Sequence, residues 1–118
     1  MISRADILIE NFKVGGLTKF GLDFGSLHAA HPALVYCLVT GFGQDTPYVS
    51  RAGYDFLGQG MFSIQSLTGE REGQPQKIGG AFADIFSGLY SVIDIQAALA
   101  ARMRSDLDHI WISHCSTQ

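Results

Sequence analysis

Two short apolar runs, at residues 6–10 and 34–39, have the length and composition of buried β-strands. The stretch between them, residues 17–31, contains two short helical patterns, which Gly21 and Pro32 end. A strand, a short helical connection and a second strand make a crossover unit, and such units are right-handed in nearly all proteins. We therefore predict two parallel neighbouring strands and an α/β fold.

The longest apolar stretch, residues 81–103, repeats with the period of an α-helix. Four of its polar residues fall on one narrow stripe of that helix: Asp84, Ser87, Ser91 and Asp94. Apolar side chains occupy most of the remaining circumference, so we expect a central helix rather than a surface helix. Gly79 and Gly80 break the chain just before it, which places Asp84 near the first turn, where free backbone N–H groups favour an anion. Taken alone, this position is explained by stabilisation of the helix start.

A second long helix is predicted over residues 53–67, where the apolar residues again follow helical spacing. Gly58 and Gly60 inside it would each cost ~1 kcal/mol relative to alanine, which indicates close packing against that side of the helix. Residues 110–112 have the composition of a short final strand. Short parallel strands and two long helices are thus expected to form a single domain over residues 1–118.

Composition narrows the class of protein. The chain has 118 residues, of which 47% are hydrophobic and 16% are charged, as expected for a folded globular protein. Its net charge of −3 gives no electrostatic basis for binding nucleic acid or an acidic membrane. Asp84, Asp94 and Gln96 interrupt the 81–103 stretch, so we expect no membrane span. The first residues lack the pattern of a secretory signal, and a cytoplasmic location is expected.

Sites for nucleotide cofactors and metals are not predicted. The loop at residues 40–48 has glycines, but it has neither the dinucleotide fingerprint nor the Lys-Ser/Thr ending of a phosphate loop. His109, His114 and Cys115 lack the spacing of a zinc ligand set, so no metal site is expected. Cys37 lies in an apolar run and is expected to pack as a reduced thiol.

Four motifs follow one another along the chain, at residues 5–12, 39–44, 53–56 and 80–84. Together they resemble the class III CoA-transferases, the family of formyl-CoA and carnitine-CoA transferases. The resemblance runs from residue 5 to about residue 103. It implies part of a Rossmann-like domain that acts on coenzyme A and acyl-CoA as substrates and holds no tightly bound cofactor.

By this resemblance, Asp84 corresponds to the catalytic aspartate of the family. Its carboxylate would attack an acyl-CoA thioester to form an anhydride, the CoA thiolate would convert this into an aspartyl-CoA thioester, and an incoming carboxylic acid would resolve it. Other mechanisms fit less well. Asp84 and Asp94 would stand ~15 Å apart on one helix, too far for the carboxylate pair of a glycosidase, and the chain has no Gly-x-Ser-x-Gly nucleophile motif.

The resemblance also assigns six residues to the CoA and acyl sites: Asn11, Phe12, Lys19, Phe20, Tyr54 and Asp55. The first two match positions that contact CoA, although Asn11 alone could equally close a turn. Lys19 and Phe20 match a basic and apolar pair near the adenosine and phosphate portions of CoA. Tyr54 matches an aromatic position that lines the acyl site, with Asp55 as its acidic neighbour. The related α-methylacyl-CoA racemases have a histidine at the Tyr54 position, so transfer is favoured over racemisation.

The chain departs from the family pattern in its extent. Family members are much longer, with an earlier nucleotide-fold half and a second domain, so a truncated chain is expected, and residues 104–118 diverge from the family. Full-length members form interlocked dimers, and a piece of such an assembly would expose apolar faces that favour a homodimer. Two functions stay open: a CoA-transferase domain that keeps the nucleophile, or a non-catalytic oligomeric remnant that serves as a CoA- or partner-binding module.

Overall fold

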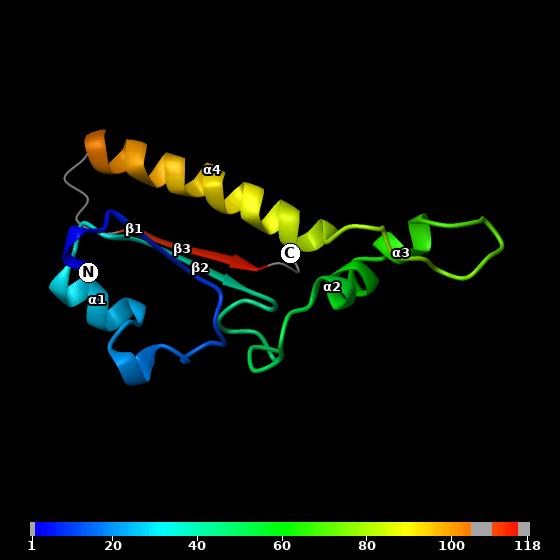
Figure 1. Cartoon of the computed structure of the whole chain (residues 1–118), viewed down its shortest axis with the longest axis horizontal. Helices are drawn as coiled ribbons and strands as arrows, with labels where there is room; N and C mark the ends of the chain where they lie inside the picture. The colour runs from blue at the N-terminus through cyan, green and yellow to red at the C-terminus, as the bar shows by residue number, and fades with distance from the viewer. Residues whose placement is uncertain (1, 105–109, 116–118) are drawn as a thin grey trace.

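A parallel three-stranded sheet organises the α/β fold, which the computed structural model describes for residues 2–104 and 110–115 (Figure 1). The strands, in spatial order, are β1 (Ile7–Glu10), β2 (Val35–Thr40) and β3 (Ile110–Cys115). The strand β2 is central, because Val35 pairs with Ile7 on one side and with Ile110 on the other. The predicted parallel pair and the predicted final strand are both confirmed.

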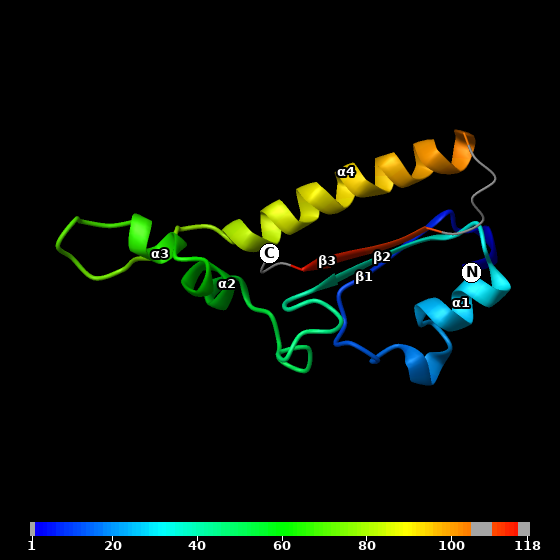
Figure 2. The ribbon, with the colours of Figure 1, turned by 180° about the vertical axis from the view of Figure 1, so that it is seen from behind.

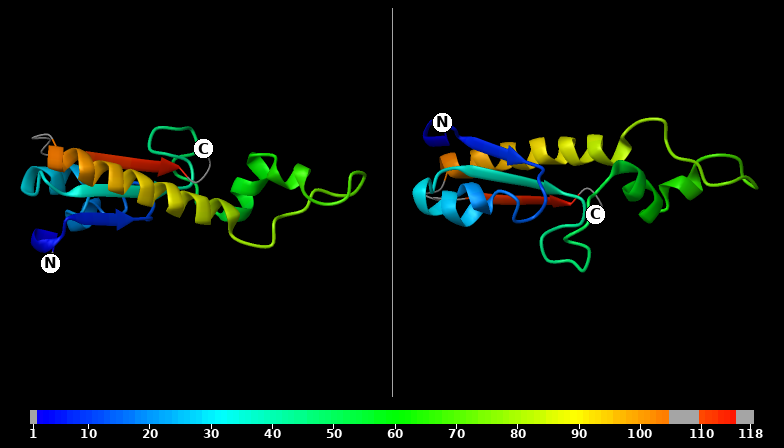
Figure 3. Two further views of the ribbon diagram at one scale, coloured as in Figure 1. Left: turned by 90° about the horizontal axis from the view of Figure 1, so that it is seen from above. Right: turned by 60° about the horizontal axis from the view of Figure 1, so that its bottom comes forward.

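Helices lie on both faces of the sheet (Figures 1 and 2). The helical elements, in chain order, are η1 (Ile2–Arg4), η2 (Thr18–Phe20), α1 (Phe24–Ala30), α2 (Asp55–Met61), α3 (Ile64–Leu67) and α4 (Phe82–Arg104). The helix α4 covers one face, α1 lies on the other, and α2 and α3 extend beyond the ends of the strand arrows (Figure 3). Because α4 runs back against the strand direction, its first turn lies at the carboxyl edge of the sheet.

Side chains of β2 point alternately to the two faces of the sheet, and this divides the core into two layers. One side of the strand packs against α4 and β3, in a cluster formed by Val35, Cys37, Ile95, Ala98 and Ile112. The other side packs against α1, in a cluster formed by Leu27, Leu34, Tyr36 and Leu38. Successive side chains of a strand point to opposite faces, so the apolar composition of β2 buries both of its sides. Full burial of each large apolar side chain stabilises the fold by about 1.5–3 kcal/mol.

The helix α4 buries polar side chains in its first half and apolar ones, Ile95 and Ala98, in its second half. Ser87 and Ser91 are buried, and their hydroxyls donate to the carbonyls of Ala83 and Ser87 at 2.8 Å each. Small hydroxyl side chains that bond within their own helix need no other partner, so α4 can lie close to the sheet. The residues more than half exposed on the opposite side are apolar: Ile85, Leu89, Tyr90, Val92 and Ile93. In the described chain α4 is therefore a surface helix, which differs from the central helix expected from the sequence.

The single helix expected over residues 53–67 is divided into α2 and α3. Between them, Ser63 has a φ of 60°, the left-handed region that an L-residue adopts only at a cost. A residue in this conformation cannot continue a right-handed helix, so α2 ends and α3 is only four residues long. The structure thus has one long helix where two were predicted.

Length and composition alone would allow α4 to cross a membrane, since its most apolar window has a mean hydropathy of 1.2. Core helices of folded proteins meet the same criteria. Here Ile95 and Ala98 of α4 pack against Val35 and Cys37 of β2. The absence of a membrane span stays a prediction.

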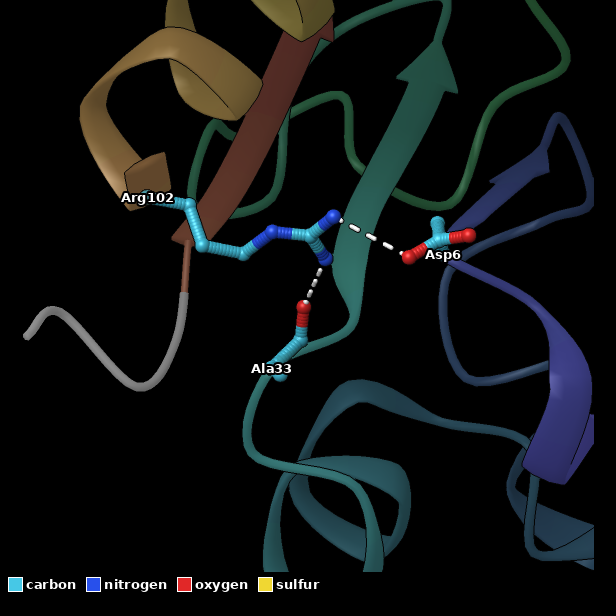
Figure 4. Close-up of polar contacts among 3 residues, drawn as sticks. All are labelled: Asp6, Ala33 and Arg102. Atoms are coloured by element: carbon cyan, nitrogen blue, oxygen red, sulfur yellow. Dashed lines mark hydrogen bonds and ion pairs between the residues drawn. The ribbon is translucent and has the colours of Figure 1, made fainter. Parts of the chain in front are cut away.

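Arg102 joins the last turn of α4 to the sheet (Figure 4). Its guanidinium donates to the Asp6 carboxylate at 3.0 Å and to the Ala33 carbonyl at 2.6 Å, just before β1 and β2. We expect Arg102→Met to lower the free energy of unfolding by about 1–2 kcal/mol, because both contacts are lost. Asp6→Asn should cost less than ~0.5 kcal/mol, since the Asp6 side chain is exposed and the Ala33 contact remains. Urea denaturation of both variants tests this, and equal losses would contradict it.

Candidate active site

A cavity of about 570 Å³ lies at the carboxyl edge of the sheet. Its walls come from the end of β1 and the loop after it, the end of β2, the loop before α2 and the first turns of α4: Ile9, Glu10, Asn11, Phe12, Lys13, Val14, Val39, Thr40, Gly41, Val49, Arg51, Ala52, Gly53, Tyr54, Asp84, Ser87 and Gly88. This volume is typical of small-molecule sites. The cavity brings together four residues that the sequence predicted for one site: Asn11, Phe12, Tyr54 and Asp84.

Asp84 enters this cavity from the first turn of α4. The pKa of Asp84 is raised above the usual 3.8, chiefly because the surrounding protein withdraws the carboxyl from water, and further because the Asp55 carboxylate is nearby. Both causes disfavour the negative charge. A carboxylate held in this way is more basic than an ordinary surface aspartate, which suits a nucleophile toward a carbonyl carbon.

The raised pKa of Asp84 predicts how its replacement changes stability with pH. The folded state holds the Asp84 proton more tightly than the unfolded chain, so ionisation at neutral pH lowers stability, and this loss disappears below the unfolded pKa. Asp84→Asn should therefore raise the free energy of unfolding at neutral pH, by less than ~1 kcal/mol because the side chain is exposed. Below pH ~3.5 the two proteins should be equally stable. Urea unfolding across this pH range tests the prediction, which a less stable variant at neutral pH would refute.

The loop after β1 presents Asn11 and Phe12 to the cavity. Glu10 holds this loop, because one oxygen of its carboxylate accepts from the Phe12 N–H at 2.7 Å. The other oxygen lies 3.3 Å from the Tyr36 hydroxyl, which also lies 3.0 Å from the Leu22 carbonyl. Burial, together with the Glu10 charge, raises the pKa of Tyr36 to about 12, so its hydroxyl remains a donor. The strand end is thus fixed by a partly buried network beneath the cavity.

Tyr54 reaches the cavity because two glycines meet just before it. Gly41 follows β2, Gly53 precedes Tyr54, and a Cβ on Gly41 would stand 2.1 Å from the Cα of Gly53. No larger residue fits at either position, since real Cβ atoms do not come this close to backbone. The contact sets the path of the loop that carries Arg51 and Tyr54 along the cavity wall.

Lys19 and Phe20 lie in η2 and do not line the cavity. The Lys19 ammonium lies 4.8 Å from the centre of the Phe20 ring, as a cation–π pair. The cations that do line the cavity are Lys13 and Arg51, which sequence reasoning missed. Lys13 directly follows the Asn11-Phe12 pair in the sequence. This neighbouring position could have indicated that Lys13 lines the same site.

Asp55 was expected beside Tyr54, but it is not among the residues that line the cavity. Its carboxylate instead accepts a hydrogen bond from the Ala83 N–H at 2.6 Å, at the start of α4. Asp55 therefore contacts the first turn of α4, the helix that carries Asp84, and not the cavity.

Metal-ligating side chains do not gather among those that the structure describes, since no three His, Cys, Asp or Glu residues of that set could hold a metal ion. Cys37 is a buried free thiol, and burial is the main cause that raises its pKa. His109, weighed as a ligand with His114 and Cys115, lies outside the described residues. The absence of a metal stays a prediction.

Comparison with known proteins decides the family. The sequence profile of CoA-transferase family III matches residues 1–110. The chain belongs to CoA-transferase family III. This family III chain is 56% identical over 105 residues to a succinate–glutarate CoA-transferase of Agrobacterium fabrum, a match that covers 89% of the chain and 26% of that relative. It is 35% identical over 100 residues to a succinyl-CoA:glutarate CoA-transferase of Mus musculus, covering 85% of the chain and 23% of the relative.

A solved structure of the same fold supports the family assignment. The crystal structure of a CaiB/BaiF family protein from Brucella suis matches this family III chain with a TM-score of 0.90 and 54% identity, and the match covers 98% of this chain and 30% of that one. The chain spans about a quarter of the length of the curated relatives named above.

Proposed function

We propose that this chain carries the nucleophile and part of the CoA-binding wall of an enzyme that moves CoA between an acyl-CoA and a free carboxylic acid. The observation that carries the proposal is the position of Asp84, which lines one cavity together with Asn11, Phe12 and Tyr54. The names of the relatives favour succinyl-CoA and a second dicarboxylate as the substrates. Transfer is preferred to racemisation because Tyr54 lacks the proton-transfer chemistry of a histidine.

The proposed reaction uses only the Asp84 carboxylate as a covalent group. A carboxylate oxygen attacks the thioester carbonyl, the C–S bond breaks, and a mixed anhydride and the CoA thiolate form. The thiolate then attacks the Asp84 carbonyl carbon and releases the first acid, which leaves Asp84 as a CoA thioester. The acceptor carboxylate reverses these two steps, so that a new acyl-CoA leaves and the free Asp84 carboxylate returns.

Two cations on the cavity wall support an anionic substrate. Lys13 follows the Asn11-Phe12 loop, and Arg51 precedes Tyr54, so both flank the proposed substrate positions. The Arg51 guanidinium lies 4.3 Å from the centre of the Tyr48 ring, which supports its planar group from one side. Such cations bind the phosphates of CoA or the distal carboxylate of a dicarboxylate through charge-assisted hydrogen bonds.

Isothermal titration calorimetry with CoA tests the proposed site. Lys13→Ala should weaken binding about tenfold, as expected for one charge-assisted contact. Lys19→Ala changes the same charge in η2, outside the cavity, and serves as the matched control. A loss confined to Lys19→Ala would move the phosphate site to the pair predicted from sequence. If the unmodified chain binds no CoA at millimolar concentration, the non-catalytic module becomes the better function.

We also propose that the chain forms a homodimer through the exposed apolar side of α4, because Ile85, Leu89, Val92 and Ile93 would otherwise remain in water. Size-exclusion chromatography with light scattering should show a dimer at micromolar concentration. Leu89→Asp should shift the population to monomer, whereas Leu67→Asp, at an exposed residue of α3, should not. A monomeric unmodified chain would rule out this association.

A further inference from the structure

The start of α4 takes its hydrogen-bond acceptor from α2. The residues just before α4, at positions 79–81, are two glycines and an alanine, which have no side-chain acceptor for the free N–H groups of the first turn. Asp55 supplies the acceptor instead. Its Oδ1 accepts from the Ala83 N–H at 2.6 Å and lies 3.4 Å from the Asp84 nitrogen. The negative charge of Asp55 also suits the positive end of the dipole of this 23-residue helix.

Gln59 holds Asp55 in this position from one turn further along α2. The Gln59 side chain is fully buried, with 0% of its surface exposed. Its Nε2 donates to Asp55 Oδ2 at 2.7 Å and to the Gly80 carbonyl at 3.1 Å. Its Oε1 accepts from the Ile78 N–H at 2.9 Å. Donor and acceptor ends are both paired, so the amide has one orientation and connects α2 to the segment that leads into α4.

We propose that Asp55 and Gln59 form a latch that fixes the first turn of α4, and with it the backbone from which Asp84 enters the cavity. The segment needs such a restraint, because a Cβ placed on Gly79 or Gly80 would meet no heavy atom within 4 Å. Two glycines in open space leave the backbone free to move. The two latch residues are positioning residues, and only the catalytic consequence of the latch rests on the proposed function.

Three variants separate the latch from general stability. Gln59→Met keeps the volume and removes the three hydrogen bonds of the Gln59 side chain. Asp55→Asn leaves the Asp55 position with one acceptor oxygen where the latch uses two, so either the Gln59 contact or the Ala83 contact is lost. Gln65→Met is the matched control, because Gln65 donates to the Phe56 carbonyl at 3.1 Å, outside the latch.

Amide hydrogen exchange of the 118-residue chain measures directly how firmly the latch holds the first turn of α4. Gln59→Met and Asp55→Asn should each exchange the Ala83 and Asp84 amides at least ~10-fold faster, with β2 amides unchanged. Gln65→Met should exchange these amides as the unmodified chain does. Unchanged exchange at Ala83 in both Gln59→Met and Asp55→Asn, or an equal rise in β2, would overturn the proposal.

Single-turnover kinetics then tests the consequence for Asp84. With succinyl-CoA at saturation, Gln59→Met and Asp55→Asn should form the Asp84 adduct about tenfold more slowly while the affinity for CoA stays the same, because a displaced nucleophile changes the reaction and not the binding. An adduct formed at the normal rate by both variants would refute the catalytic consequence. If the unmodified chain forms no adduct, the proposed function fails, and the exchange experiment still decides whether the latch exists.

Discussion

Asp84→Asn is expected to abolish formation of a covalent CoA thioester, with a loss of at least ~10³-fold in its rate. The amide that replaces the carboxylate is a poor nucleophile toward a thioester, and no other carboxylate on the cavity wall projects from α4. Intact-protein mass spectrometry after incubation with succinyl-CoA measures this loss, since the unmodified chain should gain the mass of CoA less one water.

Asp94→Asn is the matched control for this experiment. Asp94 lies on the same helix and the substitution changes the same charge, but Asp94 does not line the cavity. This variant should form the adduct as the unmodified chain does. An adduct that persists in Asp84→Asn, or that disappears equally in both variants, would remove Asp84 from its proposed role.

Gly41→Ala and Gly53→Ala are each expected to lower the free energy of unfolding by about 2–3 kcal/mol or more. A Cβ at Gly53 would stand 2.0 Å from the Cα of Gly41, and the obstacle is backbone, which cannot rotate away as a side chain can. The loop to Tyr54 would have to move, so CoA affinity should fall as well. Gly79→Ala is the control, because its Cβ would enter open space. Urea denaturation measures the difference in the free energy of unfolding. A Gly53→Ala variant as stable as the control would contradict the close contact between Gly41 and Gly53.

The strands and their direction follow from the sequence for a simple physical reason. Runs of β-branched and aromatic residues such as 34–39 must be buried on both sides, and a short crossover between two of them leaves little choice but a parallel pair. Carboxyl ends of parallel strands meet at one edge of a sheet, so Asn11, which directly follows the first apolar run, is expected at that edge. This much of the cavity was predictable without coordinates.

What the sequence did not predict depends on contacts between distant segments. Helical spacing over 53–67 contains no sign that Ser63 takes a left-handed conformation, since serine is not a usual residue for that position. The polar stripe of α4 shows which residues differ from the rest, but it does not show which side meets the sheet. Likewise, Arg51 lines the cavity from a loop whose two ends meet at the Gly41–Gly53 contact, and no local pattern encodes that contact.

Both ends of α4 are fastened, by Asp55 at the cavity and by Arg102 at the far edge of the sheet. From Asp84 to Arg102 the helix measures about 27 Å at 1.5 Å per residue. On a rigid rod of that length, a tilt of about 2° at the Arg102 end swings the Asp84 end by about 1 Å, a displacement that can cost a reaction about a hundredfold. The position from which Asp84 enters the cavity is therefore set in part by Arg102, a residue that does not line the cavity.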